Sequence, residues 1–174
     1  MTRKIIFLDR DGVINHEIGY LHKISDFKFI DEDFSSYIYL KQIGFSFIIV
    51  TNQSGIARGI YSEKDYHLLN DWMIDEFKKN DIVILDSYFC PHGPEDNCEC
   101  RKPRTGMFVD AIQKYSIDLN NSWMIGDKES DITAARKSGI YNTVIVRSGH
   151  KIDEKSTKAS FIIDSIKDIK EIIY

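Results

Sequence analysis

The sequence predicts an α/β fold, in which a Rossmann-like parallel sheet carries helices on both faces. Short apolar segments alternate along the chain with longer amphipathic ones, which is typical of such a sheet. Polar residues directly follow three apolar segments, at Asp9, Thr51 and Asp127. Because open α/β sheets bind ligands at the carboxyl ends of their strands, this regularity indicates a functional site at one sheet edge. The length of 174 residues suits one domain, residues 1–174.

Two strands and the helix between them are expected at the start of the chain. Residues 4–8 and 45–50 are apolar runs that end abruptly at a polar residue, as buried strands would. Asp33 is expected to cap the intervening helix, and Gly44 is expected to end it. The apolar residues at helical spacing in this segment are Phe34, Tyr37, Ile38 and Leu40.

A second helix is expected after residue 61. Ser62 and Asp65 resemble a capping box, in which each side chain binds the backbone N–H of the other residue. The apolar residues that follow at helical spacing are Tyr66, Leu69, Met73 and Phe77. The other expected elements are a brief strand at 86–89, a helix opening at Thr105, a strand at 123–125, a helix at 129–138 closed by Gly139, a strand at 143–146, and in the tail a strand at 161–163 and a helix at 165–173.

Composition and charge argue against two classes of function. Hydrophobic residues make up 43% of the chain and charged residues 29%, an ordinary balance for a soluble protein. The net charge of −4 offers no basic field to a nucleic-acid backbone, so no nucleic-acid partner is expected. No apolar run reaches the roughly 18 residues of a membrane span, and no signal peptide is recognisable. We therefore expect a cytoplasmic protein, monomeric because it lacks coiled-coil heptads, with any anionic substrate held by local cations or a metal.

Acidic residues gather where two of the expected strands end. Asp9 and Asp11 lie two residues apart on a strand-to-loop turn, where Gly12 permits a tight bend. Asp127 follows another strand. Converging carboxylates of this kind bind Mg²⁺, and the cation would let a carboxylate attack a phosphoryl group despite the repulsion between two anions. The alternative interpretation is that these acids merely cap a helix and a turn.

All three cysteines of the chain lie in one loop, residues 90–100. The possible metal ligands in this loop are Cys90, His92, Cys98 and Cys100. Three thiolates and one imidazole form a closed tetrahedral set suited to structural Zn²⁺. An odd number of cysteines without a secretory signal makes a disulfide framework a poorer interpretation. Arg101 and Lys102 follow directly, so a zinc-clamped loop would hold both cations over a substrate. Incidental thiols and a solvated basic pair are the alternatives.

Three segments of the chain carry a resemblance to known enzymes. They run from Phe7 to Asn15, from Val50 to Gly59 and from Met124 to Lys128. They are similar to segments of the haloacid dehalogenase-like (HAD-like) phosphohydrolases. The resemblance is greatest to the D-glycero-D-manno-heptose 1,7-bisphosphate 7-phosphatases and the related histidinol-phosphate phosphatases. The runs from Thr51 to Gly59 and from Cys98 to Pro103 are the most specific.

The resemblance implies a phosphatase mechanism in two halves. Asp9 would attack the phosphoryl group and form an aspartyl-phosphate. Asp11 would protonate the departing alkoxide and later deprotonate the hydrolytic water. Thr51 and Lys102 would stabilise the transferring phosphoryl oxygens. Mg²⁺ would be held by the Asp9 side chain, the Asp11 backbone carbonyl and the Asp127 side chain. The close relatives also carry a zinc loop, so both Mg²⁺ and Zn²⁺ are expected.

The site is expected to be open, without a cap domain. Only 40 residues separate Asp11 from Thr51, and they must include a strand and a helix, whereas a separate domain needs about 50 residues or more. Loops 15–30 and 90–104 would form the walls. The further residues that the resemblance places against the substrate are Arg10, Glu17, Ile18, Gly19, Tyr20, Asn52, Gln53, Ser54, Arg101 and Lys128.

The implied substrate is a small sugar bisphosphate. The implied reaction removes the C7 phosphate of the heptose bisphosphate in nucleotide-activated heptose (lipopolysaccharide) biosynthesis. Histidinol phosphate is the alternative substrate, and either heptose anomer and either an ADP- or a GDP-activated branch is compatible with these residues. A zinc-stabilised binding module without catalysis is the alternative of another class. The histidines expected to be mere surface or packing residues are His16, His22, His67 and His150.

Overall fold

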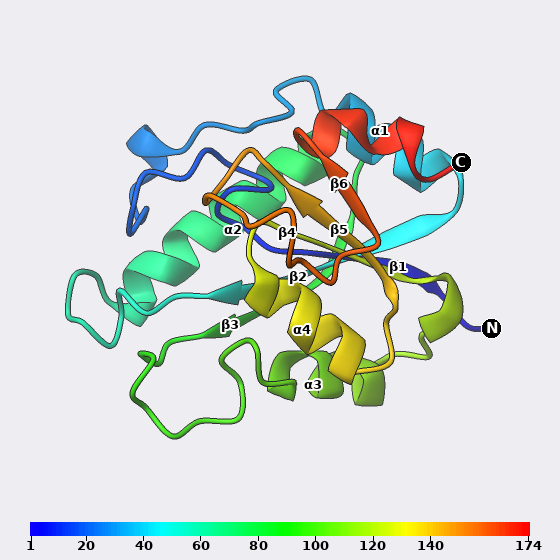
Figure 1. Cartoon of the computed structure of the whole chain (residues 1–174). Helices are drawn as coiled ribbons and strands as arrows, with labels where there is room; N and C mark the ends of the chain where they lie inside the picture. Colours follow the sequence, from blue (N-terminus) through cyan, green and yellow to red (C-terminus); the bar gives the residue numbers. More distant parts are fainter.

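A computed structural model describes all residues of the chain, 1–174. The strands of the chain form one six-stranded sheet (Figure 1). The strands are β1 (Lys4–Leu8), β2 (Phe45–Asn52), β3 (Ile84–Cys90), β4 (Trp123–Gly126), β5 (Asn142–Val146) and β6 (Phe161–Ile163). Their order is β3-β2-β1-β4-β5-β6, and every neighbouring pair is parallel. The predicted parallel α/β sheet is therefore confirmed. The order reverses between β1 and β4, and such a reversal is where a sheet of this kind binds ligands.

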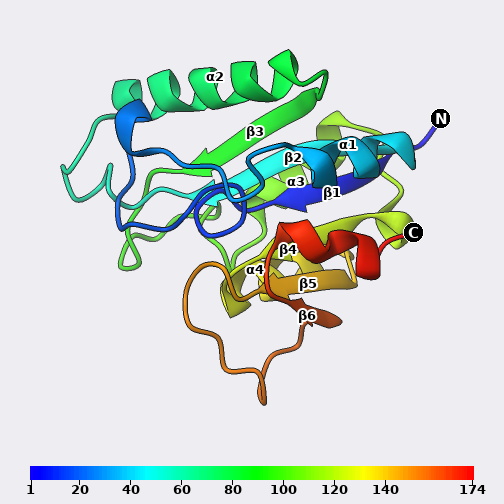
Figure 2. The same ribbon diagram turned by 90° about the horizontal axis from the view of Figure 1, so that it is seen from above.

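Helices cover both faces of the sheet, and Figure 2 shows β3 and β6 at its two edges. The α-helices are α1 (Ser35–Gln42), α2 (Glu63–Lys79), α3 (Gly106–Lys114) and α4 (Glu129–Lys137). The 3₁₀ helices are η1 (Ile24–Asp26), η2 (Leu119–Asn121) and η3 (Ile166–Glu171). Only η1 and α1 lie between β1 and β2, and only α2 lies between β2 and β3, so neither interval holds an inserted domain. None of the helices combines the length and apolarity needed to cross a membrane.

The core consists of two apolar layers that share the sheet. Successive side chains of a strand point to opposite faces, so Ile6 and Leu8 of β1 join one layer and Ile5 and Phe7 the other. The larger layer, of 25 buried residues, includes side chains of α1, α2 and η3. The smaller layer, of 12, lies under α3 and α4. Burial on both faces explains why these strands read as continuous apolar runs rather than alternating ones.

Two local predictions are corrected by the structure. The N-cap of α1 is Phe34 in a left-handed conformation, not Asp33, whose carboxylate accepts only from the Ser35 N–H at 3.1 Å. The buried Asp31 carboxylate accepts from the Ser36 N–H at 2.8 Å, because a buried acid needs a donor more than an exposed one does. In the tail, the expected helix at 165–173 is the short 3₁₀ helix η3.

Phe77 is the centre of an aromatic cluster in the larger layer. Its ring lies edge-on to Tyr37, with centroids 4.9 Å apart, and to Phe34, at 5.2 Å. Because the side chain is fully buried, we expect Phe77→Ala to lower the free energy of unfolding by about 3–5 kcal/mol. Urea denaturation would measure this loss. Leu68→Ala on the same helix, where the residue is 59% exposed, is the matched control, and equal losses in the two variants would contradict the packing described.

Candidate active site

The acidic residues at the ends of β1 and β4 meet in space. Asp9 follows β1, and its backbone N–H donates to the Ile125 carbonyl of β4 at 3.0 Å. Asp127 follows β4 directly. Carboxylate oxygens of Asp9, Asp127 and a third acid, Asp131, all lie within 4.8 Å of one another, and all three residues are buried. The structure thus gathers three carboxylates at the reversal of strand order.

Lys102 is the cation within this acidic cluster. Its Nζ lies 3.0 Å from Asp9 Oδ1 and 2.6 Å from Asp131 Oδ1, and it donates to the Val50 carbonyl at 2.7 Å. Burial by itself lowers the pKa of Lys102, but the neighbouring carboxylates of Asp131 and Asp9 outweigh burial and raise it. The ammonium therefore stays charged although the residue is only 3% exposed.

Asp131 is a site residue that the sequence did not reveal. Its Oδ2 accepts from the backbone N–H groups of Asp127 and Lys128, both at 3.1 Å, and so caps the start of α4. Its other oxygen binds Lys102. The only indication in the sequence was that Asp131 lies four residues after Asp127. An acid at that position is equally typical of an ordinary helix cap.

The acidic cluster carries more negative charge than Lys102 neutralises. Burial, followed by repulsion from Asp131, raises the pKa of Asp9 well above its ordinary value. The same two causes raise the pKa of Asp127 to about 6. Three carboxylates around one ammonium therefore leave the site short of positive charge, which a divalent cation would supply.

The surroundings of Asp127 also fit a cation. Its Oδ1 is buried and has no hydrogen-bond partner in the protein. A Cβ atom at Gly12 or Gly149 would overlap the Asp127 carboxylate, so both positions require glycine for the backbone to approach this closely. Hard carboxylate oxygens and an unpaired buried acceptor are the donor set that Mg²⁺ prefers. The residues present therefore fit magnesium.

Asp11 lies beside the cluster and is held by hydrogen-bond donors. Arg10 binds it with Nε at 3.2 Å and Nη2 at 3.0 Å, while Asn15 Nδ2 donates to it at 3.0 Å and Gln53 Nε2 at 3.1 Å. The Arg10 guanidinium also donates to the Leu21 carbonyl at 2.9 Å. Arg10, which we expected to contact substrate, is thus turned into the protein, where it orients Asp11.

A polar cavity of about 370 Å³ opens over these residues. The predicted site residues that line it are Asp9, Asp11, Glu17, Gly19, Tyr20, Asn52, Gln53, Ser54, Arg101, Lys102, Asp127 and Lys128. Lining residues that we did not predict are Gly55, Arg58, Tyr61, Ser130, Asp131 and His150. Arg10, Ile18 and Thr51 do not line the cavity. Ile18 is 57% exposed outside it, whereas Thr51 and Arg10 are buried.

Gln53 connects Thr51 to Asp11. Its Nε2 donates to Thr51 Oγ1 at 2.8 Å and to Asp11 Oδ2 at 3.1 Å, and its Oε1 accepts from the Tyr61 hydroxyl. Because the Asp11 oxygen accepts, the N–H end of the Gln53 amide faces the acid, and the oxygen end is left to the Tyr61 hydroxyl. The Tyr61 ring in turn stacks on His22, with centroids 5.1 Å apart.

His150 departs from its predicted role. We expected a surface or packing residue, but its Nδ1 lies 2.6 Å from Asp127 Oδ2, and its backbone N–H donates to the same oxygen at 2.9 Å. The two residues are 23 positions apart, so no sequence spacing indicated the contact. Of the other histidines, His16 is exposed and His67 packs against Phe89.

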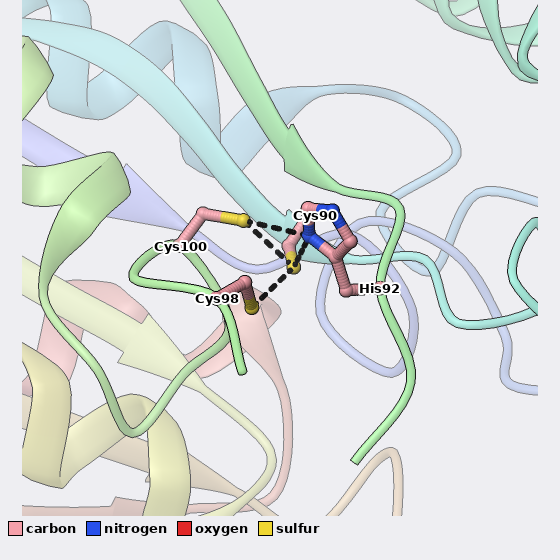
Figure 3. A group of neighbouring side chains, drawn as sticks. All are labelled: Cys90, His92, Cys98 and Cys100. Carbon is pink, nitrogen blue, oxygen red and sulfur yellow. Dashed lines mark hydrogen bonds between the residues drawn. The ribbon is translucent and has the colours of Figure 1, made fainter. Parts of the chain in front are cut away.

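The cysteine loop brings its four expected ligands together (Figure 3). Their donor atoms all lie within 4.8 Å of one another, and no disulfide is present. Cys90 Sγ lies 3.8 Å from Cys98 Sγ, and His92 Nδ1 lies 3.3 Å from Cys100 Sγ. Two thiolates that share one tetrahedral zinc are about 3.8 Å apart, given Zn–S bonds of about 2.3 Å. The pair of Cys90 and Cys98 matches this separation, whereas Cys90 Sγ and Cys100 Sγ lie closer, at 2.9 Å. Arg101 and Lys102 directly follow Cys100 in the chain, and both line the cavity.

Comparisons of sequence and structure place the chain in a class of enzymes. A family model described as HAD-hydrolase-like matches residues 99–169. The crystal structure of D,D-heptose 1,7-bisphosphate phosphatase from B. bronchiseptica, complexed with magnesium and phosphate, is similar with a TM-score of 0.82 at 29% identity. That similarity covers 97% of this chain and 96% of the other. The fold is that of a HAD-like hydrolase, and HAD phosphatases use Mg²⁺.

Curated relatives narrow the assignment within that class. D-glycero-alpha-D-manno-heptose-1,7-bisphosphate 7-phosphatase of Photorhabdus laumondii is 45% identical, over 90% of this chain and 89% of the relative. D-glycero-beta-D-manno-heptose-1,7-bisphosphate 7-phosphatase of Pasteurella multocida is 41% identical, over 98% and 97%. The chain belongs to this family of heptose bisphosphate phosphatases. It is accordingly an enzyme, a phosphoric monoester hydrolase.

Proposed function

We propose that the enzyme removes the C7 phosphate of D-glycero-D-manno-heptose 1,7-bisphosphate in nucleotide-activated heptose biosynthesis. The observation that carries this proposal is the buried Asp9 carboxylate at the base of a polar cavity, next to Lys102 and Asp127. The names of relatives that align over most of the chain support the sugar bisphosphate as substrate. The open cavity accommodates a substrate with two charged ends better than a sealed pocket would.

Asp9 is the proposed nucleophile. One of its carboxylate oxygens forms a bond to phosphorus as the bond from phosphorus to the C7 oxygen breaks, which leaves an aspartyl-phosphate. Asp11 gives the departing alkoxide its proton. In the second half, water attacks the phosphorus of the aspartyl-phosphate as the bond from phosphorus to the Asp9 oxygen breaks. Asp11 takes the water proton, inorganic phosphate leaves, and the Asp9 carboxylate is restored. Arg10, Asn15 and Gln53 hold Asp11 in place for both proton transfers.

Lys102 and Thr51 are proposed to stabilise the transferring phosphoryl group. Lys102 lies 3.0 Å from Asp9 Oδ1, so its ammonium stands beside the point of attack. Thr51 is buried and does not line the cavity, so its role rests on the family resemblance; its oxygen accepts a hydrogen bond from Gln53, which leaves its own hydrogen to donate. The proposed magnesium ligands are the Asp9 and Asp127 side chains and the Asp11 backbone carbonyl. When bound, Mg²⁺ neutralises the repulsion between the carboxylate and the phosphoryl anion.

Substrate preference can be measured with a panel of phosphate monoesters. We expect kcat/KM for the heptose 1,7-bisphosphates to exceed that for histidinol phosphate by about 100-fold or more, because a polar cavity rejects a substrate that leaves its hydrogen-bonding groups unpaired. Both anomers belong in the panel, since the two relatives described are named for different anomers. A higher kcat/KM for histidinol phosphate would reject the proposed substrate.

We also propose that the cysteine loop binds one structural Zn²⁺. Purified enzyme should contain about one zinc per chain, and Cys100→Ser should lower both the zinc content and the activity, because Lys102 lies only two residues beyond this ligand. Elemental analysis by mass spectrometry and a phosphate-release assay measure the two effects. Asn97→Ala, an exposed position in the same loop, is the control. A zinc-free chain that folds and works fully would contradict the proposal.

Residues 1–174 are further proposed to act as one domain and as a monomer. Both apolar layers pack on the same sheet, so neither half of the chain has a core of its own. Light scattering after size-exclusion chromatography would report the mass, and a stable dimer would contradict this part.

A further inference from the structure

The segment from Ser148 to His150 contacts the turn that follows β1 and the Asp127 carboxylate that follows β4. Ser148 Oγ donates to the Gly12 carbonyl at 2.7 Å, which ties the segment to the turn after β1. Gly149 lies so close to Asp127 that a side chain there would overlap its carboxylate. The segment after β5 is therefore held against Asp127 by the contacts of Ser148 and Gly149. His150, which lines the cavity, contacts the same carboxylate.

His150 forms hydrogen bonds to only one of the two oxygens of the Asp127 carboxylate. Oδ2 accepts from the His150 backbone N–H at 2.9 Å and lies 2.6 Å from Nδ1 of the imidazole. Oδ1 is buried and receives no hydrogen bond from the protein. Because the Asp127 side chain has no solvent exposure, water does not equalise the two oxygens. One oxygen is thus anchored twice, and the other is left for a ligand.

We propose that His150 is a positioning residue that orients Asp127 for the divalent cation. The imidazole N–H and the backbone N–H hold Oδ2, which prevents rotation of the carboxylate and leaves Oδ1 to bind the metal. Hydrogen-bond partners behind a metal ligand fix its orientation and raise the affinity of the site. This inference rests on the proposed function, because it assumes that the cluster of Asp9 and Asp127 binds Mg²⁺. In this role His150 acts through Asp127 and is not itself a metal ligand.

Two substitutions separate hydrogen bonding from packing. His150→Phe keeps a planar ring of similar size and loses the donor. His150→Asn loses the ring but keeps an N–H group near the position of Nδ1. If the hydrogen bond to Asp127 matters, the asparagine variant should resemble the wild-type enzyme and the phenylalanine variant should not. His16→Ala, at an exposed position outside the cavity, is the matched histidine control.

The affinity of the free enzyme for Mg²⁺ is the main readout. Calorimetric titration with MgCl₂, without substrate, should give His150→Phe a Kd about 10-fold higher or more, in the range found when such supporting partners are removed. The Kd values of His150→Asn and His16→Ala should stay within about threefold of wild type. In turnover, His150→Phe should need more Mg²⁺ for half-maximal rate yet regain most of its kcat at saturating Mg²⁺.

Each outcome decides for or against this role. A wild-type Kd in His150→Phe, or equal losses in the phenylalanine and asparagine variants, would overturn it. His150→Ala replaces the phenylalanine variant if that variant does not fold, with the same criteria, since the His150 side chain is 41% exposed and its removal leaves no sealed cavity. A wild-type enzyme that binds Mg²⁺ and hydrolyses heptose bisphosphate, with His150→Phe unaffected, refutes this inference alone. A wild-type enzyme that does not bind Mg²⁺ refutes the proposed function as well.

Discussion

Asp9→Asn is expected to abolish turnover while leaving the fold intact. An amide is not a nucleophile towards phosphorus, so kcat should fall by about 10⁴-fold or more, a loss typical of removing a nucleophile. The fold should persist because the asparagine oxygen can still accept from Lys102 Nζ. Burial and repulsion from Asp131 raise the pKa of Asp9, so its charge destabilises the folded protein at neutral pH. Without Mg²⁺, the variant should therefore be at least as thermally stable as wild type.

Phosphate release and thermal unfolding measure the two halves of this prediction. Asp110→Asn, at an exposed position on α3, controls for an asparagine introduced elsewhere. Running the assays with and without Mg²⁺ also tests the alternative of a non-catalytic binding module, for which neither the substitution nor the metal would change phosphate release. Substantial activity in homogeneous Asp9→Asn enzyme would refute the assignment of the nucleophile.

Lys102→Met is expected to lower both stability and rate. Methionine keeps the unbranched stem of lysine but leaves Asp9 and Asp131 without their shared buried cation. Removing one partner of a buried ion pair costs about 3–5 kcal/mol in the free energy of unfolding. Loss of the charge beside the point of attack should lower kcat by about 10²- to 10³-fold. Urea denaturation should be done in Mg²⁺-free buffer without a chelator, because a chelator would also remove the proposed zinc.

The stability deficit of Lys102→Met should depend on pH with a defined sign. The pKa of Asp127 is raised to about 6 by burial and by Asp131, and the pKa of Asp9 is raised as well. A carboxyl group whose pKa is raised on folding takes up protons in the folded state, so it destabilises that state as pH rises from about 4 through 6. Without Lys102 this repulsion grows, and the deficit should be larger at pH 8 than at pH 5.

A surface lysine provides the control for the Lys102 experiment. Lys114 pairs with Asp86 at 2.7 Å, but its side chain is 60% exposed, and water screens the pair. Lys114→Met should therefore change stability little at either pH. If Lys102→Met changed stability as little as this control, the acidic cluster could not be as strongly shielded from water, or carry as much charge, as the structure implies.

Much of the fold follows from patterns that are local in the sequence. The apolar runs at 4–8 and 45–50 each end at a polar residue because the strand leaves the core there, and both form strands. The capping box of Ser62 and Asp65 is present as predicted, with the Asp65 N–H donating to Ser62 Oγ at 3.1 Å. Such patterns are readable because the interacting groups lie within one turn of each other.

The acidic part of the site was predictable because residue type and strand position coincided there. Asp9 and Asp127 were identifiable because carboxyl ends of neighbouring parallel strands share an edge. Arg10 stands in the same motif, and position alone could not show that its guanidinium turns inward to Asp11 and the Leu21 carbonyl. Ile18 likewise lies in a predicted contact segment but is exposed and does not line the cavity.

The sequence by itself therefore determined the class of fold, the acidic strand ends and the set of possible zinc ligands. Only the tertiary structure decided that Asp131 shares Lys102 with Asp9, and that His150 holds one oxygen of Asp127. Local patterns arise from hydrogen bonds and burial within a few residues. The strengths of contacts between buried charges depend instead on distance and on exclusion of water, and both are set by how segments far apart in the chain pack together.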